Sequence, residues 1–186
     1  MVARRRWGAF QRSLLMPHVA KRHRRGSSLP SEVSALRRQL LLDPEARERV
    51  LTRLVAILYG ADAAAALLAC DVLAQLGGPA CMLPLVETVL WSDPDGGELQ
   101  RELRIAALEG LRSAAADDDT VVSTFLAASR DPDPEIAWLA AAALGDCRAN
   151  AARASRALVP CLEHGDGRVR RAARRSLTRL AATRAA

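Results

Sequence analysis

Aromatic residues are scarce in this chain of 186 residues. Only six are present, three tryptophans, two phenylalanines and one tyrosine, which argues against the aromatic-rich core of a β-sandwich. Half of the residues are nevertheless hydrophobic and 26% are charged, so the chain is not wholly disordered. Small aliphatic side chains must therefore do the packing, in one ordinary domain or in a short array of repeats.

Long hydrophobic runs are also missing. No stretch of 18 uncharged apolar residues occurs, so we expect no membrane span. The apolar run at residues 13–20 is broken by Pro17 and His18 and is followed by further basic residues, which argues against a secretory signal. We therefore expect a cytoplasmic location, or a mitochondrial one if the source is eukaryotic, because an arginine-rich start without acids is also typical of transit peptides.

Motifs that carry chemistry are absent from the sequence. There is no H-E-x-x-H, no G-x-S-x-G and no glycine-rich phosphate loop, and two of the three histidines, His18 and His23, lie near the N-terminus. We read the run Asp117-Asp118-Asp119 as a helix cap rather than a cation site. We therefore expect no cofactor, no metal site and no enzyme activity. The four cysteines form no C-x-x-C pair and are expected to be reduced core residues: Cys70, Cys81, Cys147 and Cys161.

Lysine is almost absent, and the charges are unevenly distributed. Of 27 basic residues only Lys21 is not arginine. Residues 1–30 carry eight basic and no acidic residues, residues 31–147 carry nine against nineteen, and residues 148–186 carry ten against two. The net charge of +6 therefore describes no single surface. Arginine suits the recognition of phosphate or carboxylate, but a GC-rich genome produces the same bias, and both interpretations stay open.

A period of 33 residues runs through residues 102–178. Three segments superimpose, 102–112, 135–145 and 168–178, each with apolar anchors at i, i+4 and i+8 and with alanine at the middle position. This spacing predicts one buried stripe on a helix, and the small central residue allows a neighbouring helix to approach closely. The anchors are Leu103, Ala107 and Leu111, then Ile136, Ala140 and Leu144, then Val169, Ala173 and Leu177.

A second helix and a turn precede each of these segments. The turns are rich in aspartate, proline and glycine, as in Asp131-Pro132-Asp133-Pro134. The preceding helices are expected at residues 80–91, 120–129 and 152–163, an earlier copy at 46–59 and 63–76, and a lone amphipathic helix at 31–42. The unit is therefore helix, tight turn, helix.

The strings DPDPEIAWLAAAALG and DGRVRRAARRSL resemble HEAT repeats, in particular the short HEAT-like units also found in phycobilisome lyases. The resemblance covers roughly residues 45–182. It implies an all-α fold, a right-handed α-solenoid of about four HEAT-like helix-turn-helix repeats, with a basic N-terminal tail. We expect residues 1–30 to form that tail, flexible or bound to a partner, and residues 31–186 to form the solenoid.

In such a solenoid the second helices line the concave face, and residues off the buried stripe point to a partner or to water. One row of equivalent positions contains Ile105, Trp138 and Arg171. The segment around Trp138 is apolar nearly all round, so Trp138 either packs between units or anchors a partner. We take Ile105, Trp138 and Ala141 as protein-binding candidates.

The last predicted helix carries six arginines. They either neutralise phosphates or an acidic protein surface, or form the polar cap that a terminal repeat needs. The anion-binding candidates on this helix are Arg168, Arg171, Arg174 and Arg175.

The N-terminal tail combines basic clusters with apolar residues. Trp7, Phe10 and Leu14 fall on one helical face, which suits a partner groove, an anionic membrane surface or nucleic acid, although the tail is equally compatible with disorder. We add Trp7, Phe10 and Leu14 to the protein-binding candidates. The arginines at positions 4–6 join the anion-binding candidates: Arg4, Arg5 and Arg6.

These features predict a non-catalytic scaffold or adaptor that binds a protein partner, as a subunit or accessory factor of a larger assembly. The alternative is a nucleic-acid-associated module that grips phosphates through the tail and the last helix. Some HEAT-like solenoids are enzymes, the alkylpurine DNA glycosylases and the phycobilin lyases. This chain is short for the first, has an acidic middle, and gives no compositional sign of the second.

Overall fold

A computed structural model describes residues 28–91 and 97–185 of the chain. This part is helical and contains no strand, which confirms the all-α prediction. The tail candidates Trp7, Phe10 and Leu14 lie outside the described residues. So do the tail arginines, Arg4, Arg5 and Arg6.

The described helices form four consecutive pairs after a leading helix, as the sequence predicts. The leading helix is α2 (Leu29–Leu42), and a short 3-10 helix, η2 (Pro44–Ala46), connects it to the first pair. The pairs are α3 (Arg47–Leu58) with α4 (Ala63–Leu76), α5 (Pro79–Leu90) with α6 (Gly97–Ala115), α7 (Asp119–Ala128) with α8 (Pro134–Leu144), and α9 (Ala151–Cys161) with α10 (Gly167–Ala185).

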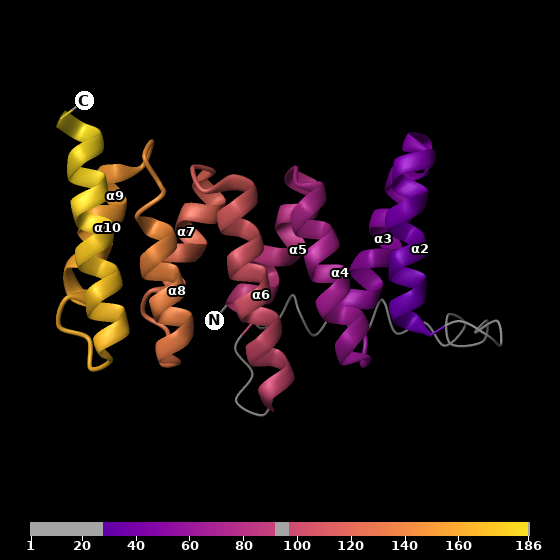
Figure 1. Ribbon diagram of the computed structural model, residues 1–186, viewed down its shortest axis with the longest axis horizontal. Coiled ribbons are helices and arrows are strands. Elements are labelled where there is room, and N and C mark those ends of the chain that lie inside the picture. The colour runs from indigo at the N-terminus through magenta and orange to yellow at the C-terminus, as the bar shows by residue number, and fades with distance from the viewer. Residues whose placement is uncertain (1–27, 92–96, 186) are drawn as a thin grey trace, which may run out of the picture.

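The pairs stack side by side into two layers (Figure 1). The second helices of the pairs, α4, α6, α8 and α10, form one layer in which each helix contacts the next, and α2 packs against α4 at its start. The first helices, α3, α5, α7 and α9, form the other layer. Helices α2 and α10 lie at opposite ends of the long axis (Figure 1), and each unit contacts only the units next to it. Each unit therefore buries its apolar stripe against its neighbours, which is the architecture of a solenoid.

The periodic anchors form the core of this stack. Ile136, Ala140 and Leu144 on α8 are completely buried, as are the equivalent alanines Ala107 and Ala173. Small residues set the spacing between second helices, since a Cβ atom at Gly110 of α6 would lie 2.6 Å from the Cβ of Ala74 on α4. The alanine-rich composition is thus what allows the helices to pack so closely.

Leu177 departs from this pattern. It is the last anchor of the repeat and is only partly buried, whereas its equivalents Leu111 and Leu144 are inaccessible to solvent. The reason is position: among the described elements α10 contacts only α8 and α9, so no further unit covers its outer side. Leu180, one turn further along α10, is buried in addition.

The four cysteines lie in the core and form no disulfide, as expected. Burial raises the pKa of Cys70 and of Cys147 to about 12, with smaller contributions from neighbouring aspartates. The thiols are therefore protonated at neutral pH and act as small hydrophobic groups.

Aspartates begin several helices. The Asp118 carboxylate accepts from the amides of Thr120 and Val121 at 2.9 and 3.1 Å, which confirms capping as its role. Asp117 accepts from the amide of Ala149 at 2.9 Å and so ties α7 to the connection before α9. Two carboxylates of the acidic run are therefore bonded within the fold.

Candidate functional site: the groove between α8 and α10

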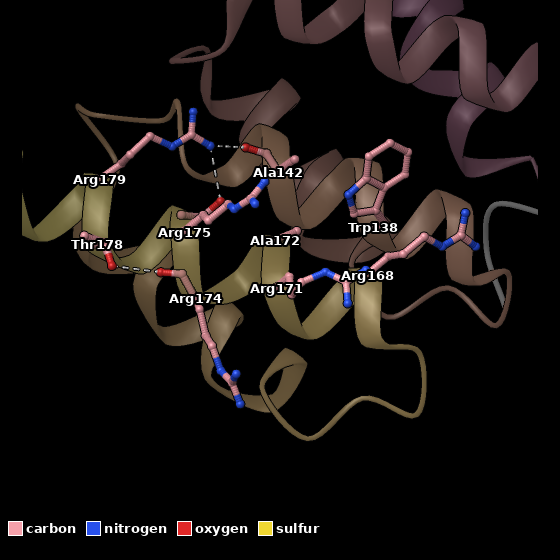
Figure 2. A pocket seen from close by; sticks show the side chains of 10 residues that line it. Trp138, Ala142, Arg168, Arg171, Ala172, Arg174, Arg175, Thr178 and Arg179 are labelled. Carbon is pink, nitrogen blue, oxygen red and sulfur yellow. Dashed lines mark hydrogen bonds between the residues drawn. The ribbon is translucent and has the colours of Figure 1, made fainter.

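A groove of about 810 Å³ lies between the last two helices of the second layer (Figure 2). We call it the α8–α10 groove. Helix α8 contributes an apolar wall and helix α10 a basic one. The lining residues are Trp138, Ala142, Arg168, Arg171, Ala172, Arg174, Arg175, Ser176, Thr178 and Arg179.

The apolar wall follows from the central place of α8 in the stack. This helix contacts α6, α7, α9 and α10, which explains why it is apolar nearly all round. Trp138 and Ala142, one turn apart, remain half-buried and face the groove. Trp138 packs against the core, which is one of the two interpretations that the sequence left open, and it also lines the groove. Its role as an anchor for a partner stays a prediction.

The basic wall follows from the helical phase of α10. Val169, Ala173 and Ser176 turn inward and are buried, and this leaves the arginines between them on the outside. The exposed arginines of the wall are Arg168, Arg171, Arg174, Arg175 and Arg179. Five of the ten lining residues are thus cationic and none is acidic.

Two of these arginines have partners in the chain. The Arg168 guanidinium lies 3.3 Å from the Asp166 carboxylate, and its Cζ atom is 5.9 Å from the centre of the Trp138 ring, within reach of a cation–π contact. Hydrogen bonds from Arg168, first from its amide and then from its side chain, lower the pKa of Asp166. Arg179 donates to Asp146 at 2.7 Å and to the Ala142 carbonyl at 3.1 Å.

The other three arginines lack such partners. The guanidinium groups of Arg171, Arg174 and Arg175 make no ion pair and no hydrogen bond with any residue that the structure describes. In Figure 2 the Arg175 side chain extends toward Ala142, the Arg171 side chain toward Arg168, and the Arg174 side chain away from both. Their charge is therefore available to a ligand.

The arginines of α6, in contrast, are bonded. Arg101 on α6 donates to Asp133, at 2.6 Å, and to Glu135, both at the start of α8. Burial alone would raise the pKa of Asp133, but hydrogen bonds from the Glu135 amide and from Arg101 outweigh it and lower that pKa. These contacts also raise the pKa of Arg101. Arg101 thus joins its unit to the next.

Arg104 is the most enclosed of these bridges. It pairs with Asp131 in the turn before α8 and donates to the Val89 carbonyl at 2.9 Å, and the side chains of the pair are only 12% and 10% exposed. Arg112, further along α6, donates to Asp146 at 2.6 Å. Asp146 therefore accepts from α6 on one side and from α10 on the other.

The outward stripe of the second layer changes in character along the stack. On α6 the exposed acids Glu102 and Glu109 flank the half-buried Ile105. The equivalent positions on α8 hold Trp138 and Ala142 after Glu135, whose carboxylate is bonded to Arg101. On α10 the same positions are all arginines: Arg168, Arg171 and Arg175. The surface thus runs from acidic through apolar to basic.

Only some of the candidate binding residues predicted from the sequence lie together in the structure. The groove brings together Trp138 and the anion candidates Arg168, Arg171, Arg174 and Arg175. Ile105 lies on α6 and does not line the groove.

The prediction for Ala141 was wrong. This residue is fully buried because it faces α10, where its carbonyl accepts from the Ser176 hydroxyl at 2.8 Å. It therefore offers no surface to a partner.

Sequence reasoning missed Ala142, Ala172, Ser176, Thr178 and Arg179 as lining residues. The signal for Arg179 was available, because it follows Arg175 by four residues and so shares its side of the helix. Ala142 could be found from Trp138 by the same spacing. The other three are small or polar residues of α10 whose sequence pattern carries no sign of a groove.

Other site types have no support in the described part of the chain. Residues 28–91 and 97–185 contain no group of three or more His, Cys, Asp or Glu side chains that could hold a metal ion. None of the described helices is both long and apolar enough to span a membrane.

A comparison with protein families agrees with this geometry. The family model for HEAT repeats matches residues 97–178, from the start of α6 into α10. Residues 97–178 are therefore similar to HEAT repeats. The HEAT-repeat match therefore includes every residue of the groove except Arg179. Among curated proteins, none matches the sequence.

HEAT repeats generally mediate interactions between proteins and are typically non-catalytic. The match does not test the resemblance to the repeats of phycobilisome lyases, which stays a prediction. The right-handedness of the solenoid also stays a prediction.

Proposed function

We propose that this chain is a non-catalytic HEAT-repeat scaffold that binds a protein partner through the α8–α10 groove. The observation that carries the proposal is the meeting of a half-buried tryptophan, Trp138, with three arginines that have no partner among the described residues. Tryptophan and arginine are the residues most enriched among those that dominate binding energy at protein interfaces.

The chemistry of the lining supports binding rather than catalysis. No carboxylate, histidine or cysteine lines the groove. Its two hydroxyls are engaged within the fold, since Ser176 donates to the Ala141 carbonyl and Thr178 to the Arg174 carbonyl at 3.1 Å. The groove therefore offers neither a general base nor an activated nucleophile.

Co-purification from the native lysate tests the proposal, using the whole chain as bait with and without nuclease. We expect a defined protein to be retained after nuclease treatment and to be lost with Trp138→Glu, because the substitution removes the indole that the partner covers and places a competing carboxylate beside the arginines of the groove. Leu83→Glu is the matched control: Leu83 is 57% exposed on α5, in the other layer, and the substitution should leave retention unchanged. Circular dichroism shows whether both variants keep their helical content.

Retention of the same protein by Trp138→Glu would remove the groove from the account. A further bait that lacks residues 1–30 shows whether the tail contributes a separate contact. That the chain is a subunit or accessory factor of a larger assembly, and that it is cytoplasmic, remain part of this proposal.

The alternative function is binding of nucleic acid through the arginines of α10 and the tail. The three unpartnered guanidinium groups favour it, but the exposed Glu102 and Glu109 on α6 would repel a strand that continued along the same layer. Its signature is recovery of nucleic acid that disappears with nuclease. On duplex DNA, log K would also fall with log salt by about 0.9 for each phosphate contacted.

A further inference from the structure

We infer that the α8–α10 groove takes an acidic peptide segment of the partner, with an apolar side chain against Trp138 and carboxylates on Arg171, Arg174 and Arg175. The inference rests on the proposed function, for which it names the chemistry of the partner.

Charge complementarity is the first argument. Five arginines line the groove and no acid does, and three of the five guanidinium groups have no carboxylate partner in the described chain. Like charges held this close repel one another, and the repulsion is relieved when carboxylates enter between them. Arginine also presents a planar fork that binds a carboxylate through two parallel hydrogen bonds.

The spacing of the arginines is the second argument. Arg174 and Arg175 follow Arg171 at i+3 and i+4 on α10, so each of them begins about 5–6 Å from Arg171. In an extended peptide, alternate residues lie about 6.7 Å apart on one side. Two acids at alternate positions of such a peptide therefore match the step from Arg171 to Arg174 or from Arg171 to Arg175.

The apolar wall is the third argument. Trp138 and Ala142 of α8 and Ala172 of α10 form a surface that carbon atoms can cover, and the Arg168 Cζ atom lies 5.9 Å from the centre of the Trp138 ring. A peptide made of acids alone would leave this wall exposed to water. We therefore expect one large apolar residue among the acids, placed against Trp138.

Three other occupants fit the groove less well. Residues 1–30 of this chain carry eight basic residues and no acid, so the arginines repel them. A nucleic-acid strand long enough to leave the groove toward α6 meets Glu102 and Glu109. A second copy could offer its run of three aspartates, but Asp117 and Asp118 already accept backbone hydrogen bonds in their own fold.

The test is fluorescence anisotropy with the whole chain and three labelled probes. The first is a twelve-residue peptide with glutamates at alternate positions on both sides of a central leucine. The second is the same peptide with every glutamate replaced by glutamine, and the third is a twelve-nucleotide oligo-dT. We expect the acidic peptide to bind at least tenfold more tightly than either of the other probes.

Two variants that each remove three charges separate the site from net charge. Arg171→Gln/Arg174→Gln/Arg175→Gln should weaken the acidic peptide at least tenfold. Arg37→Gln/Arg38→Gln/Arg156→Gln, which replaces exposed arginines on α2 and α9, should change its affinity by less than a factor of about two. Circular dichroism of both variants confirms that the helices are formed.

Equal binding of the acidic and glutamine peptides, or equal losses in the two triple variants, overturns the inference. Tighter binding of the oligonucleotide overturns it in favour of nucleic acid. These failures differ from failure of the proposed function: if Trp138→Glu loses the co-purified protein while the acidic peptide does not bind, the groove holds a protein of different chemistry. If Trp138→Glu keeps that protein, the groove is not where the partner binds.

Discussion

Arg101 and Arg104 on α6 and Arg171 and Arg175 on α10 belong to the same layer of helices, yet only the first two are bonded to carboxylates. The acids that receive them, Asp133 and Asp131, come from the turn that begins the next second helix. For α10 no further unit follows in the described chain. An arginine on a second helix therefore stabilises the stack or remains available to a ligand according to what the next unit offers it.

The largest difference between the inner helices and α10 should appear in how much a truncated leucine lowers the free energy of unfolding. Leu144 and Leu177 occupy equivalent positions, but Leu144 is completely buried between neighbours and Leu177 is only partly buried. We expect Leu144→Ala to lower the free energy of unfolding by about 3.5 kcal/mol and Leu177→Ala by about 1 kcal/mol, because the second substitution leaves a smaller cavity. Urea denaturation followed by circular dichroism measures both. Equal losses would show that α10 is as enclosed as α8.

The enclosed ion pair gives the next largest effect. Arg104→Ala leaves the Asp131 carboxylate, 10% exposed, without its cation, and we expect a loss of about 2–3 kcal/mol. Arg171→Ala should change the free energy of unfolding by no more than about 0.5 kcal/mol. The double variant Arg104→Ala/Asp131→Asn should recover part of the loss, since a neutral amide then replaces the unpaired carboxylate. The same urea titrations decide, and a loss at Arg171 as large as at Arg104 would break the comparison.

Buried anchors of this kind could be predicted from the sequence, whereas the neighbours of a residue at the edge of the buried stripe could not. The period of 33 residues gives the helix pairs and the buried anchors, because a stripe at i, i+4 and i+8 fixes the inward side of each helix. It gives no information on which neighbour covers a residue that lies near the edge of the stripe. Ala141 therefore seemed exposed although it faces α10, and the groove beside Trp138 could not be located.

The pairing of arginines was equally hidden from sequence reasoning. Six arginines on the last predicted helix suggested either a polar cap or an anion site, and composition cannot separate the two. Whether an arginine is bonded within the fold or remains available depends on carboxylates far away in the sequence. For Arg104 and Arg101 on α6 these are Asp131 and Glu135, 27 and 34 residues away, and only the stacking of the units brings them into reach. A long-range contact of this kind leaves no local pattern.

A smaller effect should appear in the pH dependence of stability. Contacts including the hydrogen bond from Arg101 hold the pKa of Asp133 below its ordinary value in the folded chain. The stability that this provides is present above the pKa of the unfolded aspartate, about 3.9, and is lost as the pH falls through the folded pKa. Arg101→Ala should therefore be less stable than the parent at pH 7, with a difference that shrinks from about pH 5 to about pH 2. Thermal unfolding over this range measures it, and a constant difference would exclude the Asp133 carboxylate as its source.

The most direct test of the account is the free energy of unfolding of Arg171→Gln/Arg174→Gln/Arg175→Gln, measured by urea denaturation at low salt beside the parent chain. If the three arginines serve a ligand and not the fold, the variant will be at least as stable as the parent, because it loses no bond within the described chain and relieves repulsion between like charges. A loss of more than about 1 kcal/mol would contradict the account, since these side chains would then be part of what holds α10 in place.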